Sequence, residues 1–127
     1  MFRLQQIDHV AVTVRDVETS VRWYTDVLGL QRIHEHVWEN CPAVVAIGGT
    51  SLALLPVRSE APGGPPGPEM ICVRHIAFRT DRENFDLARR SLAARGLEVE
   101  LEDHEIAHSI YIVDPDGHQL EITTYDL

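Results

Sequence analysis

Apolar positions in the first half of the chain change from strand-like to helical spacing and then to short apolar runs. The segment IDHVAVTV, from Ile7, alternates between apolar and polar residues as a half-buried strand does. Between Asp16 and Gly29 apolar residues recur every three or four positions, with a capping side chain at the start and glycine at the end, which predicts an amphipathic helix. The runs RIHEHVW, AVVAI and SLALL predict three further strands. This half is therefore expected to form a βαβββ module.

The second half repeats this pattern. VRHIAFRT, from Val73, corresponds to the first strand, and a capping box at Thr80-Asp81-Arg82-Glu83 predicts a helix that stops at Gly96. LEVEL, SIYIV and QLEITTY then predict three strands. When the two first strands are aligned, His75 falls on His9. An internal repeat of this kind predicts an α+β fold of two tandem βαβββ modules.

A proline-rich segment separates the two halves. PVRSEAPGGPPGPEM holds five of the seven prolines, which excludes a helix or a central strand there. We expect a linker at about 57–71 between module one, about 5–56, and module two, about 72–127, all within a single domain of residues 1–127. A lid over a site is the alternative interpretation.

Three side chains are predicted to face away from the helices. Side chains alternate along a strand, so His9 and His75 lie on the faces opposite the apolar residues that pack on the helices, and Glu121 does so in the final strand. If these faces line one cavity, two imidazoles and a carboxylate form a facial triad that holds a divalent metal and leaves positions open. The alternative is that each residue is an ordinary packed or solvated side chain.

Composition narrows the classes of partner. The formal charge is −9, with 20 Asp and Glu, 11 Arg and no Lys, which argues against nucleic acid and anionic membranes and favours a small-molecule substrate. The start of the chain lacks an apolar signal segment, so we expect a cytoplasmic protein. Cys41 and Cys72 have no metal-binding or disulfide spacing and are expected to be small buried residues.

The segments IDHVAVTVRDVETSVRWYTDVLGL, VRHIAFRT and IYIVDPDGHQLEI together resemble the vicinal oxygen chelate superfamily. This superfamily includes glyoxalase I, extradiol dioxygenases, fosfomycin-resistance enzymes and bleomycin-binding proteins. The resemblance implies a U-shaped, half-barrel cavity, metal ligands at His9, His75 and Glu121, and a homodimer, in some members with exchanged modules. One divalent ion is implied, without a choice among Fe, Mn, Ni, Zn and Co.

A possible fourth metal-ligand position, residue 53, distinguishes among the members of the superfamily. Aligning DGHQLEI with GGTSLAL places Ala53 opposite Glu121, whereas glyoxalase I usually has a second glutamate there. The remaining ligand set of His9, His75 and Glu121 is similar to the metal-ligand set of extradiol dioxygenases and fosfomycin-resistance enzymes. We therefore expect a metal-dependent enzyme, of dioxygenase or lyase/isomerase type, whose substrate chelates the metal through two neighbouring oxygens.

Two other functions remain open. A metal-independent module that sequesters a drug or ligand, of bleomycin-resistance type, is the alternative from another class. A fosfomycin-type thiol transferase is ranked third: Ser109 and Tyr111 match its Ser-x-Tyr pair, but Ala11 replaces its usual Thr and the chain has no Lys for a phosphonate.

Ser109 and Tyr111 are also the candidate catalytic residues, because they share the strand face opposite Ile110 and Ile112. Tyr111 is the candidate to orient the substrate or donate a proton. The other histidines are expected to have lesser roles. His104 and His108 have HxxxH spacing, but no helix is predicted there, so they are expected to be loop residues, with acid-base chemistry as the alternative. His34 and His36 share one strand face with Trp38, which is expected to be an exposed polar face, and shaping the pocket is the alternative.

Overall fold

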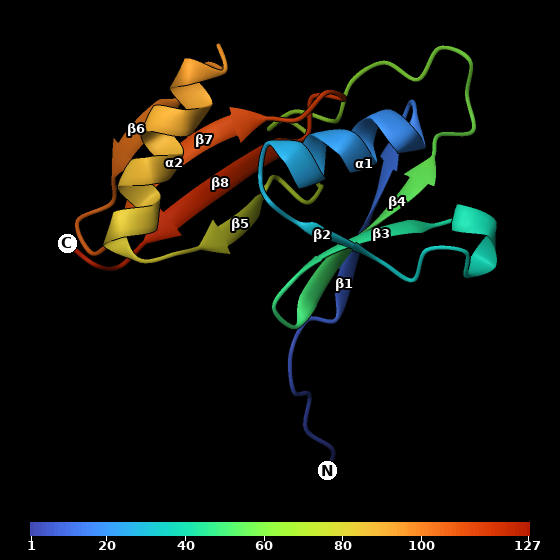
Figure 1. Ribbon diagram of the computed structural model, residues 1–127, viewed down its shortest axis with the longest axis horizontal. Coiled ribbons are helices and arrows are strands. Elements are labelled where there is room, and N and C mark those ends of the chain that lie inside the picture. Colours follow the sequence, from blue (N-terminus) through green and yellow to red (C-terminus); the bar gives the residue numbers. More distant parts are fainter. The chain divides into compact units, whose positions relative to one another are not determined.

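The computed structural model describes residues 1–127, and the chain divides into two compact units, 1–63 and 64–127. Each unit holds one helix and one four-stranded sheet (Figure 1). This confirms the predicted α+β class and its two βαβββ modules. Neither helix is long and apolar enough to cross a membrane.

In the first unit the sheet order is β1-β4-β3-β2, with β1 and β4 parallel and the other neighbours antiparallel. Helix α1 contacts β2, β3 and β4, so it covers one face of this sheet. The elements are β1 (His9–Val14), α1 (Val17–Asp26), β2 (Gln31–Ile33), a short 3-10 turn (Trp38–Asn40), β3 (Ala43–Ile47) and β4 (Thr50–Pro56).

The second unit repeats this topology in the order β5-β8-β7-β6, with β5 and β8 parallel. Helix α2 contacts β8. The elements are β5 (Ile76–Arg79), α2 (Arg82–Ala94), β6 (Glu100–Asp103), β7 (His108–Val113) and β8 (Gln119–Thr124). No helix or strand lies between β4 and β5, where the proline-rich segment was predicted.

Both helices begin where a short polar side chain caps them. Asp16 accepts a hydrogen bond from the backbone N–H of Thr19, as the sequence predicted. In α2 the cap is Asp81, which accepts from the backbone N–H of Asn84, and not Thr80. The predicted capping box was therefore one residue early, because the aspartate of the same tetrapeptide takes the capping position.

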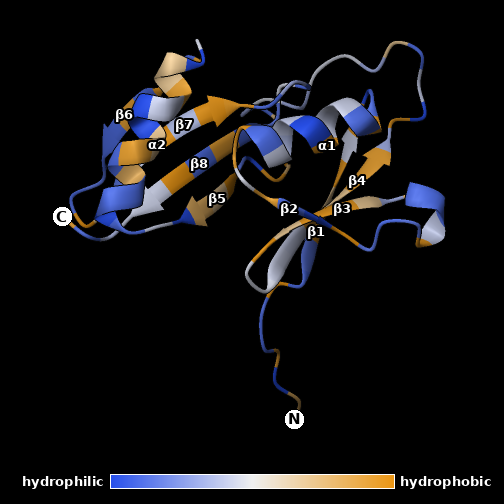
Figure 2. Cartoon of the chain, in the orientation of Figure 1, coloured by the Kyte–Doolittle hydropathy of each residue, from blue (hydrophilic) through white to orange (hydrophobic).

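Apolar side chains gather on the faces between each helix and its sheet. Figure 2 shows apolar residues concentrated in the strands, while the helices carry mostly polar residues. Tyr24 of α1 and Phe85 of α2 are fully buried, as are Leu54, Ile110 and Leu120 of the sheets. The opposite face of each sheet is left free to carry polar groups.

Three local expectations were wrong. The run RIHEHVW extends as a strand only to Ile33, because His34, His36 and Trp38 adopt positive φ angles of 56°, 71° and 55°, which an extended chain does not have. LEVEL is not a strand along its length, since β6 begins only at Glu100. Cys41 is exposed and Cys72 is half-buried, so neither is a core residue.

Candidate metal centre

His75 and Glu121 meet in the second unit. Glu121 lies in β8 opposite Ala77 of β5, and His75 immediately precedes β5, so both side chains lie at the same end of this strand pair. His75 Nε2 is 3.3 Å from Glu121 Oε1. The Glu121 side chain is only 12% exposed and that of His75 38%. A carboxylate with so little access to water needs polar partners, and imidazole is one of them.

Ser109 and Tyr111 of β7 complete the surroundings of Glu121. Tyr111 is paired with Glu121 across the β7–β8 ladder, and Ser109 with Thr123. Ser109 is fully buried, and its Oγ lies 3.1 Å from Glu121 Oε2 and 3.0 Å from Thr123 Oγ1. Because a carboxylate only accepts hydrogen bonds, the Ser109 hydroxyl is suited to orient Glu121 rather than to reach a substrate.

Tyr111 keeps its proton over a wide pH range. Burial, and then the hydrogen bond and the negative charge of Glu121, raise the pKa of Tyr111 to about 12. Its ring also makes an edge-to-face contact with the His75 ring, at a centroid distance of 5.9 Å. At neutral pH the phenol is therefore a hydrogen-bond donor beside the His75–Glu121 pair.

His104 is a further neighbour of this cluster. It lies in the turn between β6 and β7, and its Nε2 is 3.0 Å from the Tyr111 hydroxyl and 3.5 Å from Glu102 Oε2. The sequence predicted His104 in a loop, with acid-base chemistry as the alternative, because its HxxxH spacing with His108 has meaning only on a helix. The useful signal was the hairpin, which turns His104 back toward Tyr111 on the next strand.

His9 belongs to the first unit and faces away from α1, as predicted. Its Nδ1 is 2.9 Å from Asp8 Oδ2. An acceptor at Nδ1 favours the tautomer whose Nε2 lone pair is free, which is the form that binds metal. In the β1–β4 register Ala11 pairs with Ala53, as Ala77 pairs with Glu121 in the second unit. The structure thus places Ala53 at the position equivalent to Glu121.

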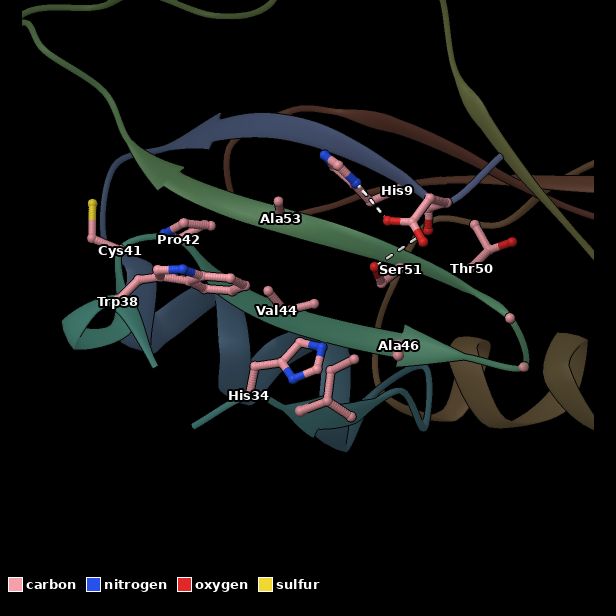
Figure 3. A pocket seen from close by; sticks show the side chains of 14 residues that line it. His9, His34, Trp38, Cys41, Pro42, Val44, Ala46, Thr50, Ser51 and Ala53 are labelled. Atoms are coloured by element: carbon pink, nitrogen blue, oxygen red, sulfur yellow. Dashed lines mark hydrogen bonds and ion pairs between the residues drawn. The ribbon is translucent and has the colours of Figure 1, made fainter. Parts of the chain in front are cut away.

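A pocket of about 440 Å³ opens on the same face of the first sheet (Figure 3). Its floor consists of Val44, Ala46 and Ala53, and His34 and Trp38 stand beside it. The rings of His34 and Trp38 meet edge to face, with centroids 5.8 Å apart. His34 and Trp38 are exposed, as expected, but they do not lie on a strand. The left-handed turn after β2 folds both rings back to the pocket, which was the alternative interpretation of His34.

The donor set suits a divalent metal. Neutral imidazole and carboxylate are the ligands that Zn, Ni, Mn, Fe and Co commonly share. Within neither unit do three His, Cys, Asp or Glu side chains gather to hold an ion. His75 and Glu121 therefore provide two adjacent donors, with Ser109 and Tyr111 as their supporting hydrogen-bond partners.

Comparison with known proteins gives consistent results. Residues 6–122 match the family model of the Glyoxalase/Bleomycin resistance protein/Dioxygenase superfamily. Metallothiol transferase FosB of Lysinibacillus sphaericus is 31% identical over 124 residues, covering 95% of this chain and 83% of the relative. Glutathione transferase FosA of Serratia marcescens is 29% identical over 121 residues, covering 94% and 80%.

Two further relatives carry other names. Catechol-2,3-dioxygenase of Bacillus subtilis is 25% identical over 119 residues, which are 91% of this chain but only 40% of the dioxygenase. A solved glyoxalase/dioxygenase from Nostoc punctiforme superposes with a TM-score of 0.77 at 25% identity, covering 94% of this chain and 90% of that one. Because proteins similar to this chain carry transferase, dioxygenase and glyoxalase names, the fold does not identify the reaction, which has to be argued from the site.

Proposed function

The chain belongs to the Glyoxalase/Bleomycin resistance protein/Dioxygenase superfamily, and we propose that it is a divalent-metal-dependent enzyme acting on a small molecule with two neighbouring oxygens. The observation that carries this proposal is the pair formed by His75 and Glu121, whose Nε2 and Oε1 atoms are 3.3 Å apart. We propose these two residues as metal ligands, and His9 of the first unit as a separate candidate ligand. A divalent ion held by them would act as a Lewis acid toward the two substrate oxygens.

The residues around Glu121 have separate proposed roles. Ser109 orients the carboxylate, because its buried hydroxyl lies 3.1 Å from Oε2. Tyr111, which burial keeps protonated, donates a hydrogen bond to a substrate oxygen that gains negative charge. His104 positions the Tyr111 hydroxyl through its contact of 3.0 Å. Only Tyr111 is proposed to touch the substrate.

A thiol transferase is the second candidate, and the relatives favour it. FosA and FosB are about 30% identical over most of their length. Such a reaction would use the same proposed metal ligands, but it also requires binding sites for an anionic thiol and its acceptor. The chain contains no lysine and carries a formal charge of −9, which disfavours anionic substrates.

Metal analysis tests the proposal most directly. Protein purified without chelators is expected to hold one divalent ion per chain, measured by mass spectrometry of the metals. His75→Ala and Glu121→Gln are expected to lose the ion, while His36→Ala, which changes an exposed histidine outside the pocket, keeps it. Full occupancy in all four proteins, or metal-free wild type that takes up no added ion, would contradict the proposal.

The reaction type needs a second measurement on the metal-loaded protein. Dioxygen uptake with a panel of catechols identifies a dioxygenase, whereas consumption of glutathione in the presence of fosfomycin identifies a thiol transferase. Chain assembly is tested alongside by light scattering, since we propose a homodimer. A variant lacking metal should fail in whichever reaction the wild type performs.

A further inference from the structure

We propose that His108 and Arg82 form a pH-sensitive latch that holds residues 125–127 against α2 at neutral pH and releases them on mild acidification. All groups of the latch lie in the second unit, 64–127. None of them is a proposed metal ligand, so the latch is independent of the proposed function. It gives the end of the chain a conformational response to pH.

The C-terminal segment is attached to its own unit through two arginines. Asp126 Oδ2 accepts a hydrogen bond of 3.3 Å from the backbone N–H of Arg82, the first residue of α2, and the C-terminus lies near this end of the helix in Figure 1. The Arg82 guanidinium also donates to the Asp126 carbonyl oxygen, at 3.5 Å. One residue earlier, the Arg79 guanidinium lies over the Tyr125 ring, 4.6 Å from its centroid. Strand β8 ends at Thr124, so these contacts, and not a sheet ladder, hold the segment.

The Arg82 side chain is fixed from two sides. Along α2 its Nη2 is 3.0 Å from Asp86 Oδ1, and the guanidinium lies 5.0 Å from the centroid of the Phe85 ring. On the other side Nη1 is 2.7 Å from Nδ1 of His108, the first residue of β7. An arginine can only donate, so Nδ1 of His108 is the acceptor and the proton of the neutral ring is on Nε2. This short contact therefore requires an uncharged histidine.

Protonation of His108 removes the acceptor. A charged imidazole carries a proton on both ring nitrogens, so Nδ1 would face the guanidinium with a proton and a positive charge. The side chains of Arg82 and His108 are only 34% and 31% exposed, so salt and water screen their repulsion incompletely. Arg82 then turns away, and Asp126 keeps only the backbone N–H of Arg82 as its contact with α2. Histidine changes its charge between about pH 5 and 8, so mild acidification is enough.

The other charged groups near His108 oppose this effect only weakly. Asp103 of β6 faces Nε2 at 3.7 Å, which favours the protonated ring. Its carboxylate is 73% exposed, however, and exposed ion pairs contribute little. The Arg82 contact is also closer, at 2.7 Å, while Asp86 and Asp126 contact Arg82 instead of the imidazole. On the β8 side the residue paired with His108 is an uncharged threonine. The repulsion by Arg82 therefore outweighs the attraction by Asp103.

NMR relaxation of the full-length, metal-free protein tests the latch. Backbone ¹⁵N order parameters of Tyr125 and Asp126 are measured at about pH 8 and at about pH 5.5, where carboxylates of ordinary acidity are still ionised. We expect a value of about 0.85 near pH 8 and a fall below about 0.6 near pH 5.5, the ranges of rigid and flexible backbone. The ring ¹⁵N shifts of His108 should show the Nε2–H tautomer near pH 8, and they should change with the same midpoint as the order parameters.

Two histidine variants separate the latch from a general effect of pH. His108→Gln is the matched variant, because a glutamine amide oxygen can accept from Arg82 and does not titrate, so both residues should stay ordered at both pH values. His36→Gln removes an exposed histidine of the first unit and should respond as the wild type does. Arg82→Ala should leave the segment flexible at both pH values.

Three outcomes would overturn the inference. The first is equal order at the two pH values in the wild type, and the second is a His108→Gln variant that loses order as the wild type does. The third is a His108 midpoint that differs from that of residues 125 and 126. This last comparison uses the wild type alone, so it decides the question even if a variant does not fold.

Discussion

Replacing Ser109 with alanine tests whether the hydrogen-bond network around Glu121 prepares a metal ligand. Ser109 is fully buried, and its hydroxyl lies 3.1 Å from Glu121 Oε2. In the variant this oxygen loses its serine partner, while Oε1 keeps its contact with His75 at 3.3 Å. The carboxylate is then free to turn. We expect affinity for a divalent ion to fall by roughly tenfold to a hundredfold, the range observed when a group that orients a metal ligand is removed.

The cost in stability is expected to be smaller than the loss of a buried hydrogen bond suggests. After the change, the Thr123 hydroxyl can donate to the His108 carbonyl oxygen, which lies 3.3 Å away, so no donor is left without a partner. We expect the free energy of unfolding to fall by about 1 kcal/mol. For a chain of 127 residues this lowers Tm by roughly 3–5 °C.

Competition with a chromogenic chelator measures the metal affinity, and thermal unfolding of the metal-free protein measures the stability. Ser20→Ala is the matched control, because Ser20 is a serine of α1 that is only 1% exposed. It should lose stability to a similar extent and keep the metal affinity of the wild type. If Ser109→Ala binds metal as tightly as Ser20→Ala, the hydroxyl does not orient Glu121 and the reasoning is refuted.

Three further predictions concern the fold and its titrating groups. Leu54→Ala, at a fully buried position, should lower the free energy of unfolding in urea by about 2–5 kcal/mol. Leu101→Ala, at a position 49% exposed, should change it little. Equal losses in the two variants would contradict the assigned core. Hydrogen bonds from Asn84 hold the pKa of Asp81 below its ordinary value of 3.8. The stability difference between wild type and Asp81→Ala should therefore be present at neutral pH and disappear as pH falls below 3.8. A difference that does not change with pH would show that the Asp81 carboxylate does not cap the helix. Burial raises the pKa of Tyr111 from 10.0 to about 12. As pH rises through this interval, metal-free wild type should therefore lose more stability in urea unfolding than Tyr111→Phe. If the free energies of unfolding of the two proteins fall in parallel with pH, Tyr111 ionises freely.

The strand faces were predictable because they depend on a local rule. Side chains alternate along a strand whatever lies beyond it, so the positions of His9, Ser109 and Glu121 away from the helices followed from the pattern of their apolar neighbours. The repeat then made Ala53 the counterpart of Glu121, which the two parallel strand registers reproduce. The helix caps followed from similarly local chemistry, to within one residue at Asp81.

Loop residues were harder to place. Nothing local indicated that the histidines and tryptophan after β2 would adopt positive φ, because non-glycine residues rarely do. That backbone carries His34 and Trp38 from an expected strand to the pocket. The contact of His104 with Tyr111 could not be predicted either, since it depends on how the β6–β7 hairpin turns.

The sequence by itself determined the modules, the direction of their strand faces and the residue types proposed to hold a metal. The tertiary structure decided which groups meet: His75 with Glu121, Ser109 with the same carboxylate, and His104 with Tyr111. It also decided that His9, His34 and Trp38 line one pocket in the first unit. The physical reason is that periodicity is set by neighbours along the chain, whereas contacts, burial and pKa are set by strand register and turns that bring distant residues together.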